Sequence, residues 1–390
     1  PHWDFIIGTG NIWKEANDGK YSRIAMPFSL VEKNQNCVHN GALTFLIDDG
    51  GNTSQYYYQI SSETCLYYKA NLWGKGYVDY QSEEAVNDEF IIDQYKQEIN
   101  SRIPKQRIED LKEHYKAIDI SKIAMSDTIR PTDMSSFGVV YNGTYYASTC
   151  QTRFGNYPFC QQLVLPSYST AKSIFAGIAM MSLAKDYPTI FDEEVNNWVK
   201  VCQGDNWQGV TFGHLLNMAT GNYQSLRHSA DEAAEHSQRF FKAANHQDKI
   251  NYSCRQFSRK SPPGSTFVYH TSDTYLLGVA LSAFLKDKLV PSDKNATTGL
   301  FDIIFKQHLW PELNLSAVAY STRRTTDKLQ QPFVGYGLFF VQDDIAKLSQ
   351  FLIDEQTPKS NFLSQKQVVN TLHRNQSNKE MRSQYPFIHY

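Results

Sequence analysis

The chain has 390 residues, enough for two domains, and its 38 Lys and Arg against 40 Asp and Glu give a net charge of −2. With this near balance, nothing in the overall charge indicates a partner held mainly by charge, such as a nucleic acid or a membrane surface. No apolar run reaches the roughly 18–20 residues that a membrane-spanning helix needs, so we expect no membrane span.

Residues 1–85 are predicted to form a β-rich domain. The segments 42–47 and 55–60 are extended in character, and the stretch 48–52 between them, Asp-Asp-Gly-Gly-Asn, is typical of a turn. The many tyrosines of this part fit the surface and core of a sheet, and a carbohydrate-binding face is the alternative.

Residues 86–120 are predicted to be a helical connector. Ile91, Ile92, Tyr95 and Ile99 recur at helical spacing, and a second helical pattern covers residues 108–115. Pro104 separates the two patterns, because proline interrupts a helix.

Residues 121–390 are predicted to form the main domain. The stretch 137–148 carries Asn-Gly between two β-prone runs, which is the preferred two-residue hairpin turn. Apolar segments predict buried helices after residue 169, over 210–218 and over 345–352.

Ser169 and Lys172 form a Ser-x-x-Lys pair at the start of the first of these helices. Residues three apart on a helix lie on the same face, so the pair places an amine beside a hydroxyl at a helix N-terminus. A serine hydroxyl is a weak nucleophile until a neighbouring base activates it. A solvated helix start with a surface lysine is the alternative, but the apolar run that follows predicts that Lys172 is buried, where a lysine is costly without a partner.

A second segment, residues 262–278, predicts a turn, a short extended piece, a polar loop and an apolar helix start. It contains Tyr269, His270 and Thr271 in succession. His270 would point away from Tyr269 in an extended strand, so we expect it to face substrate or to be structural rather than catalytic.

Together these segments resemble the serine β-lactamase and penicillin-binding-protein superfamily. The resemblance is closest to the class C-like serine hydrolases, which include esterases and 6-aminohexanoate-oligomer hydrolases. Four stretches carry it in the expected order: 169–173, 210–221, 263–278 and 337–347.

The resemblance implies an α+β fold in which an antiparallel sheet is flanked by helices, with an additional N-terminal β-rich domain. It makes Ser169 the nucleophile that forms an acyl-enzyme. Lys172 would help to deprotonate the serine, and Tyr269 would pass the proton to the leaving group. A tyrosine needs a nearby positive charge to act as a base near neutral pH, and Lys172 could supply it.

Two departures from the family pattern bear on function. Many relatives have Asn where this chain has Thr271; members on the esterase side carry a small hydroxyl residue there, so we expect Thr271 and His270 to contact substrate. The superfamily also has a third motif, Lys or His followed by Ser, Thr or Gly and then Gly, on a late strand that supplies an oxyanion-hole N–H. No such motif follows residue 337, so we expect the last strands of the domain to be missing from this chain or the sheet to be completed differently. The similar run His39-Asn40-Gly41 lies at the opposite end of the chain.

The six cysteines include no Cys-x-x-Cys pair, so a zinc ribbon is not indicated. Pairing of neighbours along the chain predicts Cys37–Cys65, Cys150–Cys160 and Cys202–Cys254, and hence a secreted or periplasmic protein; six buried thiols are the alternative. One predicted helix carries four possible metal ligands, namely His228, Glu232, Glu235 and His236. Their spacing is not that of metal ligands, and they fit a solvated helix face. We expect neither a metal nor a cofactor.

The sequence therefore predicts a serine hydrolase acting on a small or oligomeric ester or amide, and it leaves the oligomeric state open. A non-catalytic binding protein that retains the fold and a peptidoglycan DD-peptidase are the alternatives.

Overall fold

The computed structural model describes residues 2–63, 72–78, 80–81, 87–124, 128–129, 133–289, 299–357 and 361–372. The chain divides into two compact units. Unit 1 comprises residues 1–166, 313–320 and 339–350, and unit 2 comprises residues 167–312, 321–338 and 351–390. The expected boundaries at residues 85 and 120 do not coincide with this division, because the predicted connector and the predicted hairpin both lie in unit 1 with the N-terminal strands.

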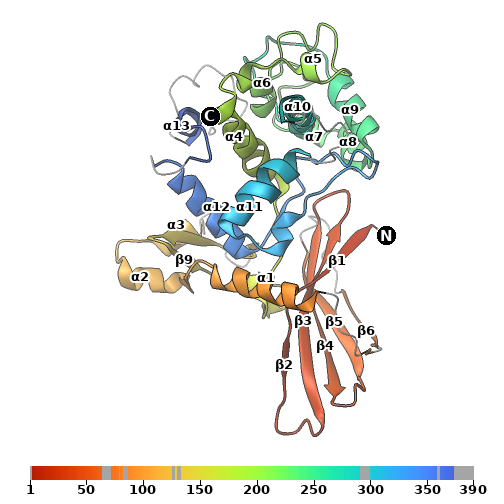
Figure 1. The fold of residues 1–390 in the computed structure, drawn as a ribbon, viewed down its shortest axis with the longest axis vertical. Helices are drawn as coiled ribbons and strands as arrows, with labels where there is room; N and C mark the ends of the chain where they lie inside the picture. The colour runs from red at the N-terminus through yellow and green to blue at the C-terminus, as the bar shows by residue number, and fades with distance from the viewer. Residues whose placement is uncertain are drawn as a thin grey trace. The chain divides into compact units, whose positions relative to one another are not determined.

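Unit 1 is built on an antiparallel sheet with the strand order β1-β3-β4-β5-β6, and β2 pairs with β3. Figure 1 shows β3, β4 and β5 side by side as its long central strands. The strands are β1 (Trp3–Ile7), β2 (Asn11–Trp13), β3 (Tyr21–Glu32), β4 (Val38–Asp48), β5 (Gln55–Glu63) and β6 (Leu72–Tyr77). The two predicted strands and the turn between them are confirmed. Asp48 closes the turn by accepting hydrogen bonds from the amides of Gly50 and Asn52 at 3.0 and 2.9 Å.

Gly41, at a register shift of β4, is a position where only glycine fits. A Cβ atom there would lie 2.5 Å from the carbonyl oxygen of Gln59 and 2.6 Å from the ring of Phe28. The carbonyl of Gly41 also accepts a 2.8 Å hydrogen bond from the Tyr157 hydroxyl, so a later segment of unit 1 is fixed to this strand.

The predicted connector forms one long helix and two short ones, α1 (Asp88–Asn100), α2 (Leu111–His114) and α3 (Ile120–Ile123). Beyond the first helix the chain forms the short strand β7 (Lys105–Arg107), which pairs in parallel with β9 (Thr144–Ala147) of the hairpin. The hairpin partner of β9 is β8 (Gly138–Tyr141). The predicted two-residue turn is confirmed, since Asn142 and Gly143 have φ values of 49° and 73°. Four very short strands complete unit 1: β10 (Gln151–Thr152), β11 (Gly155–Asn156), β12 (Leu165–Pro166) and β13 (Phe339–Phe340).

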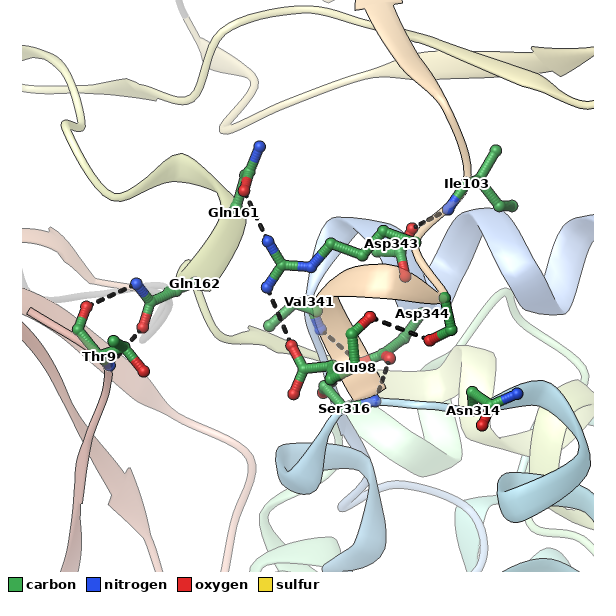
Figure 2. Close-up of polar contacts among 12 residues, drawn as sticks. Thr9, Glu98, Ile103, Gln161, Gln162, Asn314, Ser316, Val341, Asp343 and Asp344 are labelled. Carbon is green, nitrogen blue, oxygen red and sulfur yellow. Dashed lines mark hydrogen bonds and ion pairs between the residues drawn. The ribbon is translucent and has the colours of Figure 1, made fainter. Parts of the chain in front are cut away.

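Two aspartates hold the start of α12 (Gln342–Asp354) within unit 1 (Figure 2). Asp343 accepts a 3.0 Å hydrogen bond from the amide of Ile103. Asp344 accepts from both the amide and the hydroxyl of Ser316 at 2.7 Å, and from the amide of Val341 at 2.9 Å. The contact between Ile103 and Asp343 joins segments 240 residues apart in the sequence within one unit, which a contiguous domain boundary cannot describe.

Unit 2 is mainly helical. Its helices are α4 (Ile178–Asp186), α5 (Val195–Trp198), α6 (Phe212–Leu216), α7 (Ala230–Ala233), α8 (Gln238–Lys242), α9 (His246–Arg255), α10 (Thr271–Leu289), α11 (Trp310–Leu313) and α13 (Gln365–Leu372), together with the end of α12. The long helix α10 packs against α5, α6 and α9 and is buried along most of its length, in keeping with its central place in this unit (Figure 1).

Two of the three predicted disulfides are confirmed. Cys150–Cys160 closes a loop in unit 1, and Cys202–Cys254 joins two segments of unit 2 that are 52 residues apart. The third predicted pair includes Cys65, which lies outside the described residues. In the described part of the chain no helix has both the length and the apolar character that crossing a membrane requires.

Candidate active site

The segment that carries Ser169 is an irregular helix start. Tyr168–Thr170 forms one 3₁₀ turn, and the π-helical segment Lys172–Gly177 leads into α4. Tyr168 has a φ of 43°, a left-handed conformation that is uncommon for a non-glycine residue. Ser167 anchors the turn, because its amide donates to the carbonyl of Leu338 at 2.9 Å and its hydroxyl accepts from the amide of Leu338 at 3.1 Å. The result is that Ser169 is exposed at the start of a buried helix.

Two polar groups converge on the hydroxyl of Ser169. The Tyr269 hydroxyl donates to the Ser169 Oγ atom at 2.6 Å, and the Lys172 Nζ atom donates to the same oxygen at 3.1 Å. Tyr269 is half-buried and lies two residues before the start of α10. The three residues expected to be catalytic are therefore brought together around one oxygen atom, although 100 residues separate Ser169 from Tyr269.

Lys172 is buried, with 8% of its surface exposed, as the sequence predicted. Besides Ser169, its amine donates to the Thr271 Oγ1 atom at 2.9 Å and to the carbonyl of Gly335 at 3.2 Å. An ammonium group has three N–H donors, and these three acceptors match them. Burial lowers the pKa of Lys172 to about 8, while the charges of Glu232 and Asp273 act in the opposite direction. A lysine with this pKa supplies a useful fraction of free amine near neutral pH.

Burial raises the pKa of Tyr269, and the charge of Glu232 raises it further, whereas the hydrogen bond with Ser169 lowers it. A raised pKa favours the protonated phenol, and so it does not favour the role of base that a nearby Lys172 was expected to give Tyr269. Of the two groups that touch Ser169, Lys172 is the one whose protonation changes near neutral pH.

Thr271 and His270 were expected to contact substrate, and their burial argues against this: each is only 2% exposed. His270 lies between Asp231, whose carboxylate is 3.0 Å from its Nε2 atom, and Asp273, and it stacks on the ring of Phe257 at 4.2 Å. Burial alone would lower the pKa of His270, but the hydrogen bonds to the two aspartates raise it to about 9. The raised pKa favours the protonated, positively charged form of His270, which is buried inside unit 2.

Glu232 is the residue of this network that the sequence did not indicate. Its carboxylate accepts a 3.1 Å hydrogen bond from the amide of Thr271 and a second one from the Thr271 hydroxyl. The interpretation of residues 228–236 as one solvated helix face is wrong, because Glu232 is partly buried and the segment forms two short helical pieces. His236, in the second piece, pairs with the Tyr252 hydroxyl at 2.9 Å. The described residues contain no group of three or more His, Cys, Asp or Glu side chains arranged to hold a metal ion.

The run His39-Asn40-Gly41 lies on β4 in unit 1. The side chain of Asn40 donates to the carbonyl of Val164 at 3.0 Å and accepts from its amide at 3.0 Å. No third motif follows residue 337 in the sequence, and residues 373–390 lie outside the described residues.

No protein-family model matches the chain, and no curated protein matches it in sequence. Among solved structures, the chain is similar to a Bacillus anthracis protein assigned as a 6-aminohexanoate-dimer hydrolase, with a TM-score of 0.50 and 15% identity over 71% of this chain and 68% of that one. It also matches a β-lactamase/D-alanine carboxypeptidase from Pseudomonas syringae (TM-score 0.41, 14% identity, 60% of this chain and 64% of that one). A class C β-lactamase matches with a TM-score of 0.42 and 18% identity over 65% of this chain and 71% of that one. The first similarity shows the fold alone: the chain has an α+β fold like that of this 6-aminohexanoate-dimer hydrolase.

Proposed function

We propose that the chain is a serine hydrolase that cleaves an ester or amide bond through a covalent acyl-enzyme at Ser169. The observation that carries the proposal is the convergence of Lys172 and Tyr269 on the Ser169 Oγ atom, at 3.1 and 2.6 Å. These distances are within the range that proton transfer requires. The exposure of Ser169 supports the proposal further, since a nucleophile must be accessible to its substrate.

In the proposed acylation step, the free amine of Lys172 takes the hydroxyl proton of Ser169 while the Oγ atom bonds to the substrate carbonyl carbon. Tyr269 then gives its phenolic proton to the leaving oxygen or nitrogen as the bond from the carbonyl carbon breaks. The ammonium of Lys172 returns a proton to Tyr269, so the net transfer is from serine to leaving group. The amide of Ser169, at a helix start, is the candidate donor to the oxyanion.

In the proposed deacylation step, water attacks the ester carbonyl of the acyl-enzyme. Lys172 takes a proton from the water, and the Ser169 oxygen recovers one as the acyl bond breaks. The cycle consumes one water. Ser169, Lys172 and Tyr269 account for each proton transfer in it. The substrate class is a small or oligomeric ester or amide, and the disulfides support a secreted or periplasmic setting.

The test is covalent labelling combined with turnover of a chromogenic short-chain ester. We expect a fluorophosphonate probe to add to Ser169, and Ser169→Ala to abolish both labelling and turnover while circular dichroism remains unchanged. Ser173→Ala is the matched control, because Ser173 is also exposed and lies four residues further along the same helical segment. Ser173→Ala should retain both labelling by the probe and turnover of the ester.

A wild-type protein that neither takes the probe nor turns over esters would contradict the proposal and favour a non-catalytic binding protein. Labelling of Ser169 with turnover of cell-wall peptides but not of esters would instead identify the DD-peptidase alternative.

A further inference from the structure

Glu232 binds the residue that lies directly behind the lysine of the proposed site. Both of its carboxylate oxygens are used on Thr271, one by the backbone amide at 3.1 Å and the other by the side-chain hydroxyl. Two bonds to one residue fix the orientation of the carboxylate. Thr271 is 2% exposed, so its hydroxyl is shielded from bulk solvent.

This arrangement determines the direction of the hydrogen bond between Thr271 and Lys172. A hydroxyl has a single proton, and that of Thr271 points at Glu232. The Thr271 Oγ1 atom can then only accept from Lys172, at 2.9 Å. If the hydroxyl proton were free to turn, it could instead donate to the lone pair of the Lys172 amine, which is the pair that must take the proton of Ser169.

A second pair of side chains holds the same two segments together. Asp231, the neighbour of Glu232, accepts from the amides of Gln224 and Ser225 at 2.7 and 2.9 Å and pairs with His270, the neighbour of Thr271. Residues 231–232 are thus joined to residues 270–271 by two adjacent side-chain contacts, and the cation of His270 balances part of the negative charge. This pairing explains why a glutamate can be held at a fixed place behind the lysine.

We propose that Glu232 is a positioning residue for Lys172: by holding the proton of the Thr271 hydroxyl, it keeps the lysine lone pair directed at Ser169. The inference rests on the proposed function, and it adds a fourth and fifth member, Thr271 and Glu232, to the functional network.

The charge of Glu232 has a second, measurable effect. Burial lowers the pKa of Lys172 to about 8, and the charges of Glu232 and Asp273 hold it up. Removal of the Glu232 charge therefore lowers the pKa of Lys172 further. The ionisable groups that surround this network are Tyr269, Asp273, His270, Asp231, Tyr252 and Arg239.

The experiment is the pH dependence of kcat/KM for a chromogenic ester in the full-length protein and in Glu232→Gln. Because the free amine is the active form, we expect wild-type activity to rise with pH and level off above about 8. In Glu232→Gln we expect the inflection to move down by about one pH unit, as loss of an adjacent opposite charge requires, and the plateau to fall at least about tenfold. Glu235→Gln, an exposed acid in the same segment, is the control and should match the wild type.

Two substitutions of Thr271 keep the test decisive if Glu232→Gln does not fold. Thr271→Ser keeps the hydroxyl and should retain the wild-type inflection. Thr271→Val removes the hydroxyl and should move the inflection to a lower pH. A uniform loss of activity with an unmoved inflection in both Glu232→Gln and Thr271→Val would overturn the inference and leave a structural role. If the wild type itself shows no Ser169-dependent turnover, the proposed function has failed and the inference with it.

Discussion

Two buried lysines of unit 2 have different surroundings. Lys172 donates to three oxygen atoms and has acidic groups nearby, which suits a residue that exchanges protons. Lys249 is fully buried and donates to the carbonyl of Phe240 at 2.9 Å and to the Tyr336 hydroxyl at 3.1 Å. Its amine also lies over the rings of Phe240 and Phe333, at 4.6 and 4.3 Å from their centroids. Aromatic faces stabilise a cation less than water does. Burial of a charged Lys249 therefore destabilises the folded protein more than burial of a charged Lys172 does.

Burial lowers the pKa of Lys249 from its ordinary value of 10.5 to about 7. Between these two values the folded protein binds fewer protons than the unfolded chain, so this group makes stability rise with pH in that window. We predict that from pH 7 to pH 9 the free energy of unfolding of the wild type rises by about 2 kcal/mol more than that of Lys249→Met.

The measurement is urea denaturation at both pH values. Lys172 is present in both proteins and cancels in the comparison. Parallel pH dependence of the two proteins would show that Lys249 keeps an ordinary pKa when folded.

At the scale of the element, the loop Phe333–Gly337 supplies the third acceptor of Lys172. Gly335 lies against the first turn of α10. A Cβ atom at Gly335 would overlap the Thr274 hydroxyl and lie 2.9 Å from the Thr271 methyl group. Tyr336, the next residue, accepts from the buried Lys249. The loop is thus held from two sides, and its position determines where the Gly335 carbonyl meets Lys172.

We predict that Gly335→Ala displaces this carbonyl, lowers kcat/KM for the ester at least about tenfold, and destabilises the protein by about 1–3 kcal/mol, as overpacking does elsewhere. Gly299→Ala is the control, because the nearest atoms to a Cβ there lie at 3.8 Å, an ordinary contact distance. Steady-state kinetics and thermal melts measure both effects. If Gly335→Ala is as active as Gly299→Ala, the Gly335 carbonyl is not needed to hold the lysine.

Local patterns predicted most of the elements, and the family resemblance supplied the three candidate catalytic residues that the structure brings together. The strands near residues 42–60, the Asn142-Gly143 hairpin and the buried helix after Ser169 all depend on spacing within a few residues. Glu232 was missed because its partner Thr271 lies 39 residues away, and the acid itself carries no local signal. The same limit explains why the burial of Thr271 and His270 was not predicted, because it depends on the fold around them.

At the scale of the whole molecule, the chain enters each compact unit three times. Composition changes along a sequence can indicate only contiguous domains, so the expected division into 1–85, 86–120 and 121–390 could not include residues 313–320 and 339–350 in the unit of the N-terminal sheet. Contacts such as those of Asp343 and Asp344 hold these returning segments in place, and they join aspartate side chains to backbone amides that no sequence pattern connects with them (Figure 2).

Each of the two described disulfides lies inside one unit, and this leads to a prediction about how the molecule unfolds. A disulfide stabilises mainly by restricting the unfolded chain, and more so for a longer loop. The sequence separations of 52 for Cys202–Cys254 and 10 for Cys150–Cys160 correspond to about 4 and about 3 kcal/mol on that basis.

We predict that Cys202→Ala/Cys254→Ala raises amide hydrogen exchange mainly in unit 2, and that Cys150→Ala/Cys160→Ala raises it mainly in unit 1, with the larger loss of protection in the first variant. Hydrogen-exchange mass spectrometry resolves the two units by peptide, and each variant is the control for the other. Equal loss of protection across the whole chain in both variants would mean that the units unfold as one cooperative body. In that case each disulfide would stabilise the molecule as a whole, and the two compact units would not be separate units of folding.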